Sequence, residues 1–479
     1  MKIIKLNYLS ASRIVFILAL TSIIGYYYFD IISSLSLDYL PLFSDEYLYC
    51  INALNFFKNT TLEAAITFNG TGSLIFGSDS HGFAYTLLHG MIAKVFGWHS
   101  LNFIIFNLTC LLASIVIYCS VKSLPVSRRI YACCMLLLFP ITQMYAISYM
   151  QETIHLMFSV ILSLFIYLIY RDKHNRKYII YYVAVICVAG IFRCLWFFWL
   201  IGLVPLAENK KQLAGYFALF ISGVIISYVF ALLFIEPVPN YLASVIKLLL
   251  NYDLNAVWIS LTEHFDHNIQ MYFCNFDDPL TSISVRFFNF FTTLYFIVLA
   301  VVKRDKKNTA IALIGIVNFS LLFVVYDAFY WREIRTMSPL FYFYILFLVV
   351  DLHEILIVIL VASLMYLANE TLSITYWWIG DRNGIHNNYN EAEFQSYQEV
   401  GGHIPARSVV LLDFLPDDYS CTVFYLPLSN SSGEPIRYAF QYYPAPNLPW
   451  NYVICRSTVN TQYERLVQND FIILAKNKQ

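Results

Sequence analysis

Two adjacent carboxylates, in Ser44-Asp45-Glu46-Tyr47, follow the first long apolar run of an otherwise acid-poor chain. Carboxylates accept protons in general acid–base catalysis, so paired acids just outside a membrane span indicate a functional site. A structural interpretation is equally open, in which Ser44 or Asp45 caps a helix and Glu46 occupies its first turn. A third acid, Glu152, ends a later apolar run, where it serves either the same site or the solvation of a tight hairpin.

Four basic residues are candidates for binding an anion on the same side of the membrane. Arg193 lies between Phe192 and Trp196, where a guanidinium is costly unless it meets an anion; the alternatives are snorkelling and an ion pair with a helical acid. Arg332 and Arg335 share a helix face if their turn is helical, and could cradle a phosphate or anchor the interface. The fourth candidate is His81, which is more often a loop residue.

The cysteines do not predict a metal site. Most of the 10 cysteines lie in apolar runs as small hydrophobes, and the adjacent pair Cys133-Cys134 has no accompanying histidine cluster. Cys421 and Cys455 are the two cysteines of the C-terminal tail, and we expect a disulfide between them if the tail is outside the cytoplasm. The alternative is two buried thiols. Asp277-Asp278-Pro279 is interpreted first as a turn.

The elements that must position these residues are membrane helices. The chain is 59% hydrophobic and 13% charged, against roughly a quarter charged in soluble domains. A net charge of −1 gives no preference for nucleic acid, so none is expected as a partner. Seven apolar runs approach the ~20 residues that a spanning helix needs: 12–32, 99–121, 130–149, 152–170, 213–235, 286–302 and 309–329.

Basic segments between these runs set the expected topology. Those at 122–129, 171–177, 210–211 and 303–307 belong in the cytoplasm by the positive-inside rule. Residues 178–207 must then form a short hairpin with Arg193 at its recessed tip. Residues 337–368, interrupted near Asp351, are expected to form two short helices. The prediction is an all-α polytopic domain of about 11 membrane-crossing helices, with the N-terminus inside and the C-terminus outside.

Two domains are therefore predicted. Residues 1–367 form the membrane domain, with outer loops at 33–98 and 236–285, and residues 368–479 form a small extracytoplasmic α/β domain. In this tail we expect a loop at 380–390, a helix at 391–400, and strands at 408–414, 421–428, 452–455 and 471–475.

The order of these features resembles the GT-C superfamily of membrane glycosyltransferases, which take a sugar from a polyprenyl-phosphate carrier. Such enzymes have an acidic pair in the first outer loop, matched here by Asp45-Glu46. An amphipathic segment ending in Phe-Gly follows, matched by residues 82–97, and then an acid in the second outer loop, matched by Glu152. The later matches are Arg193 in a hairpin and an aromatic-Arg turn before Pro339, with Arg332 and Arg335. The likeness covers most of residues 10–370.

The resemblance implies an inverting hexosyltransferase of the bacterial inner membrane whose site faces the periplasm. Asp45 would be the general base, Glu46 and Glu152 would bind hydroxyls or a divalent metal, and Arg193, Arg332, Arg335 and His81 would bind the donor phosphate. Its partners would be a polyprenyl-phosphate sugar, membrane lipid and a glycan acceptor such as lipopolysaccharide O-antigen, as in the serotype-converting glucosyltransferases. The alternatives are a transporter or flippase of lipid-linked saccharide, and an O-antigen polymerase.

Overall fold

The computed structural model describes most of the membrane domain and parts of the C-terminal tail. The described residues are 8–35, 41, 44–67, 82–172, 175–234, 241–325, 333–387, 391–405, 408–413, 426–433, 436–440, 452–455, 463–468 and 473–477.

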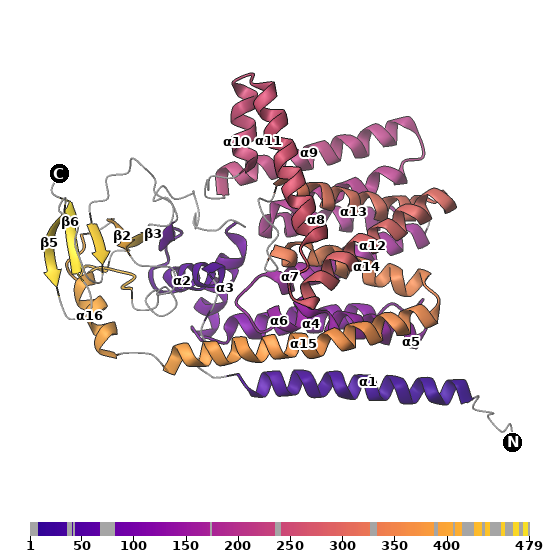
Figure 1. Cartoon of the computed structure of the whole chain (residues 1–479), viewed down its shortest axis with the longest axis horizontal. Helices are drawn as coiled ribbons and strands as arrows, with labels where there is room; N and C mark the ends of the chain where they lie inside the picture. The colour runs from indigo at the N-terminus through magenta and orange to yellow at the C-terminus, as the bar shows by residue number, and fades with distance from the viewer. Residues whose placement is uncertain are drawn as a thin grey trace.

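Helices account for nearly all of the described part of the membrane domain (Figure 1). They are, in order, α1 Tyr8–Ser33, α2 Ser44–Asn59, α3 Ala84–Phe96, α4 Asn102–Cys119, α5 Val126–Leu138, α6 Pro140–Tyr145, α7 Glu152–Arg171, α8 Arg176–Phe192, the 3-10 helix η1 Cys194–Leu206, α9 Lys210–Phe234, α10 Tyr241–Leu250, α11 Leu254–Ile269, the π-helical turn η2 Gln270–Cys274, α12 Leu280–Lys303, α13 Lys306–Val325, the 3-10 turn η3 Glu333–Met337, α14 Ser338–Asp351 and α15 Glu354–Asn387.

Six helices among the described residues are long and apolar enough to cross a membrane. Five lie within α4, α7, α9, α12 and α13, where the sequence predicts spans, and the sixth is the segment Glu354–Gly380 of α15. α1 follows the expected first span, and its described part is a shorter apolar helix. The fold is therefore a polytopic helical membrane fold, while the count of 11 crossings and the orientation stay predictions.

The expected span at 130–149 is not one continuous helix, because the chain breaks after α5. Phe139 is extended, and Pro140 starts α6, which is only six residues long. Proline lacks the N–H that a continuing helix needs and fits the first turn of a new one. The break creates a short turn before α7, and this turn presents Glu152.

The expected hairpin at 178–207 is confirmed, and its turn lies at Arg193. α8 ends at Phe192, Arg193 is extended, and η1 returns along α8, where the Tyr182 hydroxyl donates to the Trp199 carbonyl at 2.8 Å. The second arm is a 3-10 helix, which rises about 2.0 Å per residue and so covers more distance than an α-helix of equal length.

Residues 337–368 divide into two helices, as expected. α14 ends at Asp351 and is buried along almost its whole length, at the centre of the main hydrophobic core. Arg128 closes its C-terminal end by donating to the Val350 carbonyl at 2.8 Å. The second helix, α15, is longer than expected: it continues to Asn387, so a loop at 380–387 is wrong. α15 lies along α1, where Tyr27 donates to Asn369 at 2.9 Å (Figure 1).

The tail contributes helix α16 Glu391–Gly401 and a mixed sheet beyond one end of the bundle (Figure 1). The strands are β1 Ile66–Thr67, β2 Val409–Asp413, β3 Arg437–Phe440, β4 Tyr452–Cys455, β5 Tyr463–Gln468 and β6 Ile473–Asn477, in the order β1-β3-β2-β4-β6-β5. β1, β3, β2 and β4 are parallel, and β6 and β5 are antiparallel additions.

The sheet differs from the expected set of strands. β2, β4 and the start of β6 fall where the sequence places them, and α16 matches the expected helix. β3 and β5 were not predicted, the described part of 421–428 is not a strand, and β1 comes from the first outer loop. Cys421 lies outside the described residues, so the proposed disulfide to Cys455 stays a prediction.

Candidate active site

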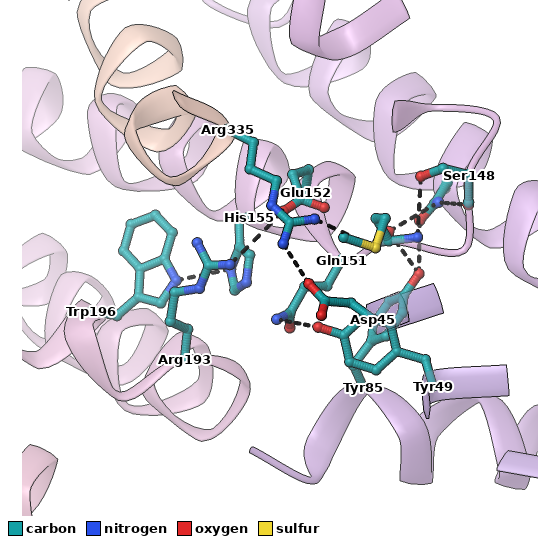
Figure 2. A network of polar contacts seen from close by, with 12 residues as sticks. Asp45, Tyr49, Tyr85, Ser148, Gln151, Glu152, His155, Arg193, Trp196 and Arg335 are labelled. Carbon is teal, nitrogen blue, oxygen red and sulfur yellow. Dashed lines mark hydrogen bonds and ion pairs between the residues drawn. The ribbon is translucent and has the colours of Figure 1, made fainter. Parts of the chain in front are cut away.

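The fold brings four of the predicted site residues into one cluster (Figure 2). Asp45 lies in the first turn of α2, and Glu152 is the first residue of α7. Arg193 lies at the junction of α8 and η1, and Arg335 lies in η3 just before α14. Each charged group therefore lies at the end of an element, where the chain turns on one side of the bundle.

The four side chains are joined by ion pairs. Arg335 contacts the carboxylate of Asp45, and its Nε is 3.6 Å from Oε1 of Glu152. Nη2 of Arg193 is 3.9 Å from the same Glu152 oxygen. These distances to Glu152 are ion-pair contacts without a hydrogen bond, and neither Glu152 oxygen is hydrogen-bonded to any described residue. Buried charges normally complete their hydrogen bonds, so the cluster has capacity for a polar ligand.

Burial separates the two acids that face the arginines. The side chain of Asp45 is 24% exposed, whereas that of Glu152 is 3% exposed. A carboxylate that removes a proton from an incoming hydroxyl must be reachable, and Asp45 fits that requirement. Glu152 lies deeper, where it holds both guanidinium groups on one side of the cluster.

Glu46 is fully buried. Its Oε1 accepts a hydrogen bond from the backbone N–H of Tyr149 at 2.8 Å. One helical turn later, the Tyr49 hydroxyl accepts from Nε2 of Gln151 at 3.0 Å. α2 therefore holds the turn that precedes α7, and this contact gives Glu46 a positioning role. Asp45 and Glu46 lie in the first turn of α2, which begins at Ser44, whereas a cap by Ser44 or Asp45 stays a prediction.

Two further side chains hold the same turn, and the sequence analysis did not identify their roles. Nδ2 of Asn107 donates to the Ser148 carbonyl at 2.8 Å, and the Tyr85 hydroxyl donates to the Met150 carbonyl at 2.9 Å. Burial, with smaller contributions from Cys110 and Glu152, raises the pKa of Tyr85 well above its usual value, so it remains a donor. Tyr85 falls in the amphipathic segment 82–97, which the sequence already singled out. Asn107 is a neutral residue inside an apolar run, and no sequence pattern predicts a role for it.

A buried hydrogen bond fixes the turn at Arg193. Nε1 of Trp196 donates to Nδ1 of His155 at 3.0 Å, and His155 lies one turn after Glu152 on α7 (Figure 2). This bond ties the first turn of η1 to the helix that carries Glu152. In the sequence, His155 follows Glu152 by three residues within an apolar run. This spacing places both on one face of a helix and could have predicted a role for His155.

A small cavity lies beside both arginine-bearing segments. It lies between η1, α13 and η3, and its lining includes Leu195, Asn318, Leu322 and Met337. Leu195 is two residues from Arg193, and Met337 is two residues from Arg335. A small space of mixed polarity, lined also by Thr336, thus lies beside the two segments that carry the arginines.

Two predicted site residues, His81 and Arg332, lie outside the described residues. Among the residues that the structure describes, no three acidic, histidine or cysteine side chains group as metal ligands. Asp45 and Glu152, the acids of the cluster, are instead paired with guanidinium groups. This donor set does not fit a divalent cation.

No protein-family model matches the sequence, and no curated protein is recognisably similar to it in sequence. Solved structures do share its fold. ArnT from Cupriavidus metallidurans bound to undecaprenyl phosphate matches with a TM-score of 0.53 over 96% of this chain and 97% of that chain, at 11% identity. The apo state of that protein gives 0.51 over 97% and 98%, at 10% identity.

A second protein has the same architecture. The Archaeoglobus fulgidus oligosaccharyltransferase, in complex with Zn and sulfate, matches with a TM-score of 0.50 at 11% identity. The match covers 90% of this chain and 67% of that chain. The chain therefore shares its fold with both of these membrane proteins.

Proposed function

We propose that this protein is a membrane glycosyltransferase that moves a sugar from a polyprenyl-phosphate carrier to a hydroxyl of an extracytoplasmic glycan, such as lipopolysaccharide O-antigen. The observation that carries the proposal is the cluster of Asp45, Glu152, Arg193 and Arg335, in which a partly exposed carboxylate lies beside two buried guanidinium groups. The reaction needs these two kinds of group, a proton acceptor and a phosphate clamp.

Arg193 and Arg335 would hold the donor phosphate. Guanidinium groups bind phosphate oxygens by charge-assisted hydrogen bonds, and a desolvated site strengthens this attraction. As the bond between the anomeric carbon and the phosphate oxygen breaks, negative charge grows on the phosphate that these groups face. ArnT, whose fold is shared over nearly both chains, was crystallised with undecaprenyl phosphate, which supports this donor class.

Asp45 would act on the acceptor. Its carboxylate takes the proton of the attacking hydroxyl while that oxygen bonds to the anomeric carbon, and the electron pair of the broken bond leaves on the polyprenyl phosphate. A single displacement inverts the anomeric centre. Arg335 contacts Asp45, so an arriving phosphate competes with this carboxylate for the guanidinium group and releases the base.

The proposed setting is a bacterial inner membrane with the site on the periplasmic side. Asp45, Glu152, Arg193 and Arg335 all belong to segments that the positive-inside rule predicts to lie outside the cytoplasm. Polyprenyl carriers and long glycan acceptors meet at that surface.

Purified protein in proteoliposomes tests the proposal. It is given radiolabelled polyprenyl-phosphate hexoses and lipopolysaccharide, and the label should move to the polysaccharide in a time-dependent way. Asp45→Asn protein, matched for abundance, is the control and should not transfer it. Movement of intact donor between leaflets without loss of its sugar would overturn the proposal in favour of a transporter. Growth of polysaccharide chain length from lipid-linked repeat units would favour the polymerase instead.

A further inference from the structure

α11 has one face that packs on the bundle. Val257 and Asn268 are its buried residues, and Nδ2 of Asn268 donates to the Phe323 carbonyl of α13 at 2.9 Å. Its first turn is closed by Asp253, whose Oδ1 accepts from the N–H of Ala256 at 3.0 Å. Figure 1 shows α10 and α11 running across the direction of α9, α12 and α13. α11 is thus a well-ordered helix oriented unlike the candidate spans.

A second face of α11 is apolar and largely exposed, and only its C-terminal end meets α13, where the rings of Phe265 and Phe323 lie 5.8 Å apart. Leu254, Trp258, Leu261 and Phe265 are spaced four, three and four residues apart, which places them on one stripe roughly 60° wide at about 100° per residue. Leu254 is 68% exposed, Trp258 67% and Phe265 51%. A stripe of large side chains this exposed is unfavourable in water.

The third face of α11 is mainly polar. Asn255, Thr262, Glu263 and Asp266 are exposed, and they lie with Ile259, 45% exposed, on the flank of the apolar stripe that is opposite Val257. A helix that meets protein, an apolar phase and water along three separate strips is suited to a boundary between lipid and water. A helix that spans a membrane would need no polar strip, and a helix in water would need no apolar one.

We propose that α11 lies along the outer surface of the membrane and buries its Leu254, Trp258, Leu261 and Phe265 stripe in the lipid interface. The partner is the bilayer itself, because α11 lies across the candidate spans and Trp258 is a residue type enriched at membrane–water interfaces. Glu263 and Asp266 are its exposed carboxylates, so this contact depends on apolar burial and needs no anionic lipid. α11 thereby anchors the outer end of α13, whose other side lines the cavity beside the arginine cluster.

Thiol labelling of the full-length protein in phosphatidylcholine nanodiscs tests this placement. Leu254→Cys probes the exposed part of the apolar stripe, and Asn255→Cys, one residue later, is the matched probe of the polar strip. Both are treated with a membrane-impermeant maleimide and read at the peptide level, which separates them from native cysteines. We expect the Asn255→Cys thiol to react about tenfold faster or more, because lipid excludes the reagent from the other, and both to react fully after denaturation. Equal rates in the bilayer would overturn the proposal.

A second measurement, fluorescence quenching of Trp258, uses the wild-type protein and so leaves the apolar stripe unchanged. Shallow brominated phosphatidylcholine quenches tryptophan at the interface, and the difference between wild-type and Trp258→Phe spectra isolates Trp258. We expect that difference signal to be quenched by brominated lipid and little affected by aqueous iodide. A Trp258 signal quenched by iodide and not by brominated lipid would show that the stripe faces water or another protein, and would refute a lipid contact.

Discussion

The Asp45→Asn substitution should lower the rate of sugar transfer and at the same time tighten binding of the lipid donor. The change keeps the size of the side chain and most of its capping ability but removes the carboxylate that contacts Arg335. General-base catalysis contributes about 10² to 10⁴ in rate, so turnover should fall by at least 10². Weakening a helix cap costs only about 1 kcal/mol, so insertion and abundance should remain nearly unchanged.

Donor binding should become tighter in the same variant. The Asp45 carboxylate contacts the guanidinium group that the phosphate needs, and breaking this partly exposed pair costs about 1 kcal/mol. Asparagine removes that competitor and the repulsion between carboxylate and phosphate. A gain of about 1 kcal/mol corresponds to roughly fivefold tighter binding.

Undecaprenyl phosphate is the probe for this measurement because it carries no sugar and cannot turn over. Its dissociation constant is measured by titration of wild-type and Asp45→Asn protein in the same detergent. Asp172→Asn is the matched control, because Asp172 also pairs with an arginine, Arg171 at 2.7 Å, but at the opposite end of α7 from Glu152. Normal turnover in Asp45→Asn would refute the base assignment, whereas lost turnover with weaker phosphate binding would refute only the competition.

Three further outcomes follow from the contacts around the cluster. Glu46→Gln keeps an acceptor for the Tyr149 N–H but loses its charge, so turnover should fall less than in Asp45→Asn, by about tenfold; initial rates of sugar transfer measure this. Trp196→Phe and His155→Ala each break one bond that fixes Arg193, so each should raise the KM for lipid donor more than it lowers kcat, and the double variant should be no worse than either. Burial lowers the pKa of His89 to about 3, below its unfolded value of about 6.5, so stability is full above pH 6.5 and is lost as pH falls toward 3. Between pH 7 and pH 5 this costs about 2 kcal/mol, and His89→Phe, which retains a ring against Phe103, should remove that loss in denaturation curves.

The charged members of the cluster were identifiable from the sequence because a charge in an apolar chain is rarely incidental. Asp45, Glu152, Arg193 and Arg335 each interrupt or border an apolar run, and the basic loops place all four on one side. Their pairing was not predictable. Which guanidinium meets which carboxylate depends on the angles at which α2, α7 and η3 end, and no local pattern encodes these angles.

The neutral residues around the cluster could not be assigned from sequence. Asn107 and Tyr85 act through backbone carbonyls of the turn before α7, and that turn exists because Pro140 breaks the preceding helix. A proline in a run of suitable length was the overlooked signal, since length alone favoured one span. β1 is only two residues long, and its partner β3 lies more than 300 residues later, so no local alternation could reveal the pairing.

α2 connects the helical bundle to the sheet, and this connection determines how Asp45 is held. One face of α2 directs Glu46 and Tyr49 to the turn before α7. The other buries Tyr47, Leu48 and Ile51 in the core of the C-terminal domain, beside Val410, Ile454 and Leu474 of its sheet. Burying a large aliphatic side chain contributes about 1.5 to 3 kcal/mol, comparable to the hydrogen bonds on the opposite face.

A two-sided helix of this kind cannot move with respect to one domain without disturbing the other. β1 strengthens the connection, because the N–H of Tyr438 donates to the Ala65 carbonyl at 2.8 Å and Oδ1 of Asn52 accepts from the N–H of Ala65 at 2.8 Å. The first outer loop is therefore built into the C-terminal sheet. The tail acts on the site through packing and main-chain hydrogen bonds, since the described members of the cluster, Asp45, Glu152, Arg193 and Arg335, all come from the membrane domain.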